Sequence, residues 1–154
     1  MDLTIHPATT SDIPEILQQR KQMYLDMGYA DSPDLARMLT ACEPFMREAI
    51  AAGTFRAWQA RLGDQAAGGG AINITPWPAH PYDLECRRAT ILNVYVYPQF
   101  RRQGIARRLM QTMIDWCRHE NFTAVYLHAS DDGRHLYETL GFQVANEMKL
   151  TLSS

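Results

Sequence analysis

The apolar positions in the first part of the chain follow two different periods. Residues 3–5 alternate between apolar and polar side chains, which predicts a short first strand. Residues 13–24 carry apolar side chains at helical spacing, which predicts a helix. Asp12 and Glu15 fit a capping box at the start of that helix, and Gly28 is a typical residue at its end.

A second helix is predicted after a short polar connection. Ser32 and Pro33 are typical of a helix start, because serine caps the first amides and proline is tolerated in the first turn. Pro44 has no amide hydrogen to donate within a helix, so we expect the helix to be broken or bent before it. Gly53 is expected to end this segment.

The next residues predict a hairpin. Residues 54–60 and 65–75 alternate like strands, and Gly63 and Asp64 lie between them as turn residues. The three glycines at 68–70 weaken the second strand, which indicates a bulge or a close approach of another backbone. Residues 76–89 contain three prolines and are predicted to form a surface loop; loops of this length are often functional.

The second half of the chain predicts a regular alternation of strands and helices. In order, we expect a strand over 90–97 closed by Pro98, a helix from about Gly104 to Glu120, a strand over 124–129, a helix over 132–140 that stops at Gly141, and one or two strands over 142–152. The strand–helix–strand unit over 90–129 predicts that its two strands are parallel.

Composition narrows the class of protein. The chain has 154 residues, of which 46% are hydrophobic and 21% charged, and this fits one globular domain over residues 1–154. A net charge of −2 favours neither nucleic acid nor an anionic membrane as a partner. The three cysteines, Cys42, Cys86 and Cys117, form no C-x-x-C pair, so neither a disulfide framework nor a metal site is expected. The first residues lack a secretory signal, and we expect a cytoplasmic protein.

Candidate chemistry concentrates where the strand over 90–97 passes into a helix. The first amides of a helix have no internal partner and lie at its electropositive end, which is a favourable site for an anion. Gly104 and Ala106 are small enough for a diphosphate to approach the backbone. Four arginines lie within eight residues, Arg101, Arg102, Arg107 and Arg108. The alternatives are that the arginines form a solvated face and that Gly104 is only a turn residue. Neither a phosphate loop nor a dinucleotide fingerprint is present.

The run Val94–Ala106, V-Y-V-Y-P-Q-F-R-R-Q-G-I-A, resembles the signature of the GNAT superfamily of acetyl-coenzyme-A-dependent N-acetyltransferases. Arg101, Gly104 and Ala106 match the family pattern [QR]-x-x-G-x-[GA]. A second block, Ser130–Phe142, ends in L-Y-E-x-L-G-F and is similar to the family's final helix and turn. The resemblance implies an α/β (α+β) fold: a mixed, mostly antiparallel central sheet flanked by helices, with a parallel βαβ unit at the cofactor site.

The resemblance also implies roles for individual residues, with acetyl-CoA as the cosubstrate and no metal. Backbone amides from about Gln103 to Ala106 bind the pyrophosphate, Val94–Val96 pairs with the pantetheine arm, and the Val96 amide donates to the acetyl carbonyl. Tyr137 protonates the departing thiolate, and core packing is the alternative reading of Tyr137. Ser130 stands where many relatives have asparagine, and Gly133 where they have alanine. The implied cofactor-binding residues are Val94, Val96, Arg101, Arg102, Gln103, Gly104, Ile105, Ala106, Ser130 and Tyr137.

The base that takes the proton of the attacking amine stays open. Some relatives carry a glutamate where this chain has Thr90, and threonine is no base at neutral pH. Asp83 and Glu85 in the proline-containing loop are candidates, with solvated loop carboxylates as the alternative. His128 is a third candidate, with a structural role as its alternative, and a chain of water molecules is a fourth.

The acceptor stays open as well. The resemblance implies that a small-molecule or peptide amine enters between the first two helices and the central strands and attacks directly in a ternary complex. Aromatic and methionine side chains are candidates for its lining, with packing in the core as the alternative for each. They are Tyr24, Tyr29, Trp77, Tyr82 and Tyr95 with Met23 and Met27. The alternative function is a non-catalytic acyl-CoA sensor or regulatory module. A homodimer is left open.

Overall fold

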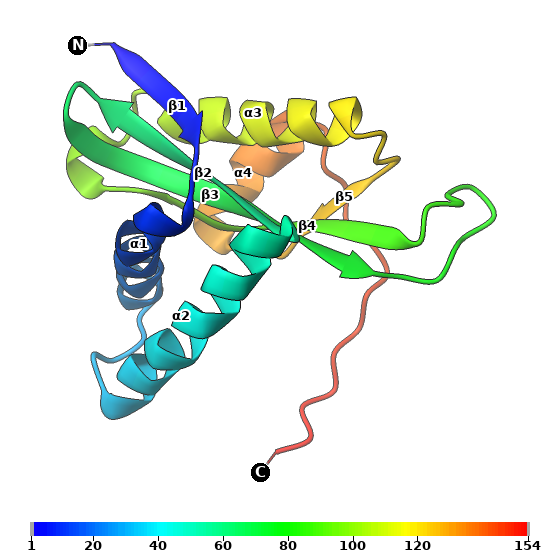
Figure 1. Ribbon diagram of the computed structural model, residues 1–154, viewed down its shortest axis with the longest axis horizontal. Helices are drawn as coiled ribbons and strands as arrows, with labels where there is room; N and C mark the ends of the chain where they lie inside the picture. The colour runs from blue at the N-terminus through cyan, green and yellow to red at the C-terminus, as the bar shows by residue number, and fades with distance from the viewer. Residues whose placement is uncertain (1, 154) are drawn as a thin grey trace.

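The computed structural model of the chain describes residues 2–153 (Figure 1). Five strands and four α-helices follow one another along the sequence, with one 3-10 turn before α1 and another after β4. The elements are β1 (Leu3–Pro7), α1 (Ile13–Asp26), α2 (Pro33–Ala52), β2 (Phe55–Leu62), β3 (Gln65–Pro76), β4 (Arg87–Val96), α3 (Ile105–His119), β5 (Val125–Leu127) and α4 (Asp131–Thr139).

The strands form one mixed sheet in the order β1-β2-β3-β4-β5. The first four strands are antiparallel to their neighbours, and β5 is parallel to β4. The predicted mixed sheet and its parallel βαβ unit are therefore confirmed. The long loop is shorter than predicted, covering residues 77–86, because β3 and β4 extend their ladder as far as the pair Pro76–Arg87.

The two faces of the sheet are covered by different helices. One hydrophobic cluster joins α1 and α2 to β2 and β3 and includes Ile13, Met46 and Phe55. A second cluster joins α3 to the opposite face and includes Leu109 and Met113. Figure 1 shows α1 and α2 on one side of the sheet and α3 on the other. The sheet, including the end of β4, therefore lies between α1 and α2 on one face and α3 on the other.

The glycine run in β3 allows close contacts that side chains at these positions would block. A Cβ on Gly68 would lie 2.3 Å from the Tyr95 carbonyl oxygen, and one on Gly70 would lie 2.8 Å from the Met113 methyl carbon. The ladder between β3 and β4 shifts register between Gly69 and Ala71. Both the predicted bulge and the predicted close approach are confirmed. Asn93, opposite this shift on β4, has a positive φ of 59°.

Two helix predictions need correction. The hydrogen bond typical of a capping box joins Asp12 to Thr9, whose amide donates to the Asp12 carboxylate at 2.8 Å, so the box lies three residues earlier than predicted. The helix α2 is continuous through Pro44 rather than broken before it. Ser32 caps its first turn, and Leu35 and Met46 are buried on either side of the proline, so packing outweighs the one missing hydrogen bond.

The last predicted strands are absent. Within the described part of the chain, residues 143–153 form no strand, although apolar side chains alternate there as they would in one. Val144, Met148, Leu150 and Leu152 are each more than 80% exposed. An alternating pattern creates a strand only where an edge supplies backbone partners. The edge next to this segment, β5, is three residues long.

Candidate active site

The strands β4 and β5 separate halfway along β4. They pair only from Ala89–Val125 to Ile91–Leu127, while β4 continues to Val96 and remains paired with β3 on its other side. The β5-facing edge of residues 92–96 therefore has no strand partner. An open edge of this kind offers backbone donors and acceptors to an extended ligand.

The Val96 amide faces this open edge. The Tyr97 amide donates to the Ala67 carbonyl at 2.9 Å, on the β3 side. Because successive peptide groups of a strand point to opposite sides, the Val96 amide and carbonyl point away from β3. The Val96 carbonyl accepts a hydrogen bond of 2.8 Å from Arg101 Nε. The Val96 amide thus lies on the β5-facing edge of β4, and its role as oxyanion donor stays a prediction.

The Arg101 side chain fastens the loop after β4. Besides the Val96 carbonyl, its guanidinium contacts the Asp26 carboxylate at 2.6 Å and lies 5.4 Å from the Tyr95 ring centroid. Burial of Tyr95, together with the charge of Asp26, raises the pKa of its hydroxyl. Arg101 therefore has partners of its own within the protein, and its predicted contact with the cofactor stays a prediction.

The start of α3 presents free backbone amides. Gly104 is the N-cap, with a positive φ of 78°, and no side chain caps the helix. Among the described residues, no backbone acceptor pairs with the amides of residues 103–106. Arg102 and Arg108 are exposed and form no ion pair within residues 2–153. Free amides and cations together suit a polyanionic ligand at this end of the helix.

Ser130 and Tyr137 belong to the same helix, α4. The Ser130 hydroxyl accepts the Gly133 amide at 3.2 Å and so caps the helix. Its hydroxyl hydrogen is free to donate elsewhere. Burial raises the pKa of the Tyr137 phenol, which keeps the group protonated at neutral pH. The Tyr137 ring packs edge to face on Phe142, with centroids 6.1 Å apart.

The comparisons with known proteins agree with this arrangement. The model of the acetyltransferase (GNAT) family matches residues 20–142. The chain belongs to the GNAT acetyltransferase family. A GCN5-related N-acetyltransferase from Ralstonia eutropha JMP134 superposes with a TM-score of 0.91 at 26% identity, over 98% of this chain and 99% of that one. No curated protein sequence matches the chain.

Two further structures resemble this acetyltransferase. A predicted acetyltransferase from Clostridium acetobutylicum, solved with acetyl-CoA, has a TM-score of 0.88 at 25% identity, over 98% of this chain and 97% of that one. AAC(6')-Iy, solved with a bisubstrate analog that contains CoA, has a TM-score of 0.74 at 15% identity, over 100% and 99% of the two chains. The second likeness shows the fold alone.

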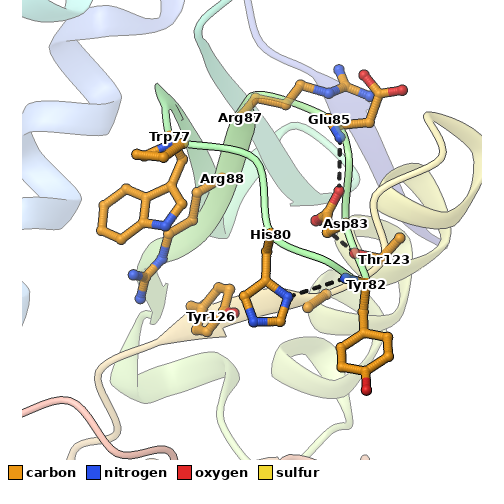
Figure 2. A pocket seen from close by; sticks show the side chains of 11 residues that line it. Trp77, His80, Tyr82, Asp83, Glu85, Arg87, Arg88, Thr123 and Tyr126 are labelled. Carbon is orange, nitrogen blue, oxygen red and sulfur yellow. Dashed lines mark hydrogen bonds between the residues drawn. The ribbon is translucent and has the colours of Figure 1, made fainter.

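The loop between β3 and β4 of this acetyltransferase lines a separate pocket of about 360 Å³ (Figure 2). The Asp83 carboxylate accepts the Glu85 amide at 3.1 Å and the Thr123 hydroxyl at 2.6 Å, so it fastens the loop to the segment before β5. The pocket lies at the start of β4 beside Arg88, whose guanidinium lies 4.6 Å from the Trp77 ring centroid and 3.8 Å from that of Tyr126.

The position of this loop pocket separates the candidate bases Asp83 and Glu85 from the open edge of β4. Val94 comes six residues after Arg88, which is about 20 Å along a strand. Asp83 and Glu85 are therefore remote from the Val96 amide. His128 directly follows β5, one residue beyond the last pair of β4 with β5, and its Nε2 lies 3.6 Å from the Glu147 carboxylate. Of these three residues, His128 follows the strand pair that borders the open edge, and its side chain is 82% exposed.

The aromatic residues expected around the acceptor divide into two groups. Tyr24 and Tyr29 pack edge to face at the end of α1, with centroids 5.1 Å apart, and Tyr95 lies on β4. Trp77 and Tyr82 lie in the remote loop and line its pocket. Sequence reasoning missed Arg20, which joins α1 to Asn93 on β4. The sequence held one indication of Arg20 as a site residue, because it lies one turn before Tyr24 on the predicted helix.

Within residues 2–153, no group of three or more histidine, cysteine or acidic side chains is arranged to hold a metal ion. No helix in that range has the length and apolar character needed to cross a membrane.

Proposed function

We propose that the protein is an N-acetyltransferase that moves the acetyl group of acetyl-CoA directly to an amine in a ternary complex. The observation that carries this proposal is the open β5-facing edge of residues 92–96, which ends at the free amides of α3. An extended pantetheine arm can pair with this edge while the pyrophosphate lies on the helix start. The Clostridium relative solved with acetyl-CoA supports the choice of cosubstrate.

The proposed reaction uses this chain's own groups to stabilise the oxyanion and to protonate the leaving group. The amine nitrogen, after losing a proton, forms a bond to the acetyl carbonyl carbon. The Val96 amide stabilises the negative charge that develops on the carbonyl oxygen, a contribution of roughly 2.7–4 kcal/mol in a comparable oxyanion hole. The carbon–sulfur bond then breaks, and Tyr137 donates its proton to the CoA thiolate.

The backbone and side-chain ligands of the cofactor are proposed as the sequence predicts them. Amides of residues 103–106 hold the pyrophosphate, with Arg101 and Arg102 near its charge. Val94 and Val96 pair with the pantetheine arm, and the free Ser130 hydroxyl hydrogen donates to it. The alternative is an acyl-CoA sensor that binds the cofactor without turnover. The presence of Tyr137 favours the enzyme, because a tyrosine phenol is protonated at neutral pH and can act as a general acid.

Calorimetric titration with acetyl-CoA tests cofactor binding, and an amine-library screen that follows CoA release tests transfer. The enzyme binds acetyl-CoA and releases CoA only with an accepted amine. Binding without CoA release from any amine would establish the sensor. Absence of binding at high micromolar acetyl-CoA would overturn both. Tyr137→Phe lowers kcat if Tyr137 is the acid.

A further inference from the structure

A polar cluster lies on the face of β4 that α1 and α2 cover. Arg20 of α1 donates through Nη1 to the Asn93 side-chain oxygen at 2.5 Å and through Nη2 to the Tyr24 hydroxyl at 3.3 Å. Arg20 Nε contacts the Met38 sulfur of α2 at 3.4 Å. Three elements thus hold one guanidinium in a fixed place.

Every one of these partners is uncharged. The ion pairs within residues 2–153 do not include Arg20, although the whole chain has 17 acidic residues against 15 basic ones. Arg101, on the neighbouring loop, does pair with a carboxylate, that of Asp26. A partly buried cation loses part of its hydration, and a counter-ion normally compensates that loss. Arg20 is therefore a positioned positive charge whose counter-ion the described residues do not supply.

Asn93 adds a second unused donor. Its side chain is 7% exposed, and its Oδ1 is taken by Arg20. Its Nδ2 is buried and has no hydrogen-bond partner within the described residues. The contact with Arg20 fixes which end of the amide is the oxygen, and the Nδ2 hydrogens are left without an acceptor among the described residues. Buried donors without partners are rare in folded proteins, and each one requires an explanation.

The cluster lies next to the proposed transfer site. Asn93 directly precedes Val94–Val96, the segment whose β5-facing edge is open. It lies at the register shift of β4, on the face opposite α3. The cofactor would approach from the α3 side, so Arg20 and Asn93 face the side that is left for the acceptor.

We propose that Arg20 and Asn93 form a binding subsite for a carboxylate of the acceptor, so that the acetylated amine belongs to an amino acid or another amino-carboxylate. The proposal rests on the proposed acetyl transfer and specifies its substrate class. A carboxylate offers two oxygens: one accepts from the guanidinium and the other from the Asn93 amide. Its negative charge supplies the counter-ion that Arg20 lacks.

The test compares amines that differ only in this charge. A panel of α-, β- and γ-amino acids and their carboxamides is assayed for CoA release with the intact protein, after calorimetry has established acetyl-CoA binding. The expected result is a kcat/KM at least tenfold higher for the acid than for its amide in the best pair. Arg20→Gln brings this ratio close to one, mainly through KM of the acid, and Arg20→Lys retains part of it.

Two further variants accompany the Arg20 substitutions, one as a control and one as a second way to remove the subsite. Lys21→Gln removes a charge from the same helix, at a residue that already faces Asp31 at 4.0 Å, and leaves the ratio unchanged. Asn93→Asp places a carboxylate beside Arg20 and abolishes the preference, which covers the case in which Arg20→Gln does not fold.

Three results would overturn the proposal. In the first, acetyl-CoA binds and no amino-carboxylate is acetylated. In the second, amides react as well as acids. In the third, the ratio survives in folded Arg20→Gln. Failure to bind acetyl-CoA would instead overturn the proposed function itself.

Discussion

The ring of Tyr137 occupies the space in which a side chain at Gly133 would lie. A Cβ built on Gly133 comes within 2.8 Å of the Tyr137 hydroxyl oxygen and 2.7 Å of the nearest ring carbon. The two residues are one helical turn apart on α4. The absence of a side chain at position 133, where many relatives have alanine, therefore sets the position of the proposed acid.

Gly133→Ala should displace the Tyr137 hydroxyl and lower kcat. The tyrosine ring can rotate away from the new methyl group, so the fold survives while the proton donor moves. We expect kcat to fall about tenfold or more, within the ~10²–10⁴-fold range of general acid–base catalysis. Steady-state kinetics measures this, with Tyr137→Phe and the double variant completing a cycle. If the two losses simply multiply, the substitutions act independently and this explanation is wrong.

Arg101→Ala should loosen the loop that precedes α3. The variant loses the hydrogen bond to the Val96 carbonyl and the ion pair with Asp26, which is largely solvent-screened. We expect the free energy of unfolding to fall by about 1 kcal/mol, as measured by urea denaturation. Acetyl-CoA affinity should fall as well.

Asp26→Asn separates the two contacts of Arg101, because it removes the ion pair and keeps the hydrogen bond to the Val96 carbonyl. We expect it to leave acetyl-CoA affinity closer to that of the unmodified chain than Arg101→Ala does. Unchanged affinity in Arg101→Ala would confine cofactor binding to the backbone amides of residues 103–106.

Because of the buried Cys117 thiol, the free energy of unfolding should fall as the pH rises into the alkaline range. Cys117 lies on the buried side of α3, and burial raises the pKa of its thiol to about 11, against 9.0 for an unperturbed thiol. The folded state therefore holds this proton more tightly than the unfolded state. The stabilisation is complete below about pH 9 and is lost as pH rises towards 11, by roughly 1.4 kcal/mol per unit in that range. Urea denaturation at pH 8 and pH 10 should show a smaller decline in Cys117→Ala. An identical decline in both would exclude the thiol as its source.

The backbone parts of the site were predictable because they follow from local sequence. Gly104 and Ala106 mark a helix start after a β-prone strand, and the structure places free amides there. The partners of side chains were not predictable in the same way. Arg20 and Asn93 are 73 residues apart, and only the packing of α1 on the sheet brings them together. Arg101 looked like a ligand residue in the sequence, and its bonds to Val96 and Asp26 likewise depend on tertiary structure.

The errors in the fold have the same origin. The residues after Phe142 alternate as a strand does, yet a strand also needs an edge of sufficient length, and β5 offers three residues. Pro44 predicts a break by its missing amide, whereas buried residues on both sides of it hold α2 together. In each case a local rule was overruled by contacts that lie outside the local sequence.

His128 should act as the base for the acceptor amine, and the loop carboxylates should not. His128 follows β5 where β4 and β5 separate, and its exposed imidazole has the Glu147 carboxylate 3.6 Å from Nε2. We expect His128→Ala to lower kcat on the order of 10²-fold with an amine that is protonated at neutral pH. Glu147→Gln should cause a smaller loss, because it orients the imidazole without contacting the substrate. Steady-state kinetics with the acceptor found by screening measures both.

Asp83→Asn serves as the matched control for these variants. The Asp83 carboxylate accepts hydrogen bonds from the Glu85 amide in the loop and from Thr123 before β5. It lies near the start of β4, and Arg88 at that end is about 20 Å along the strand from Val94. Its loss should lower the melting temperature slightly and leave kcat unchanged. The opposite pattern, in which Asp83→Asn abolishes turnover and His128→Ala does not, would require the acceptor to bind in the loop pocket. It would move the proposed chemistry away from the open edge of β4.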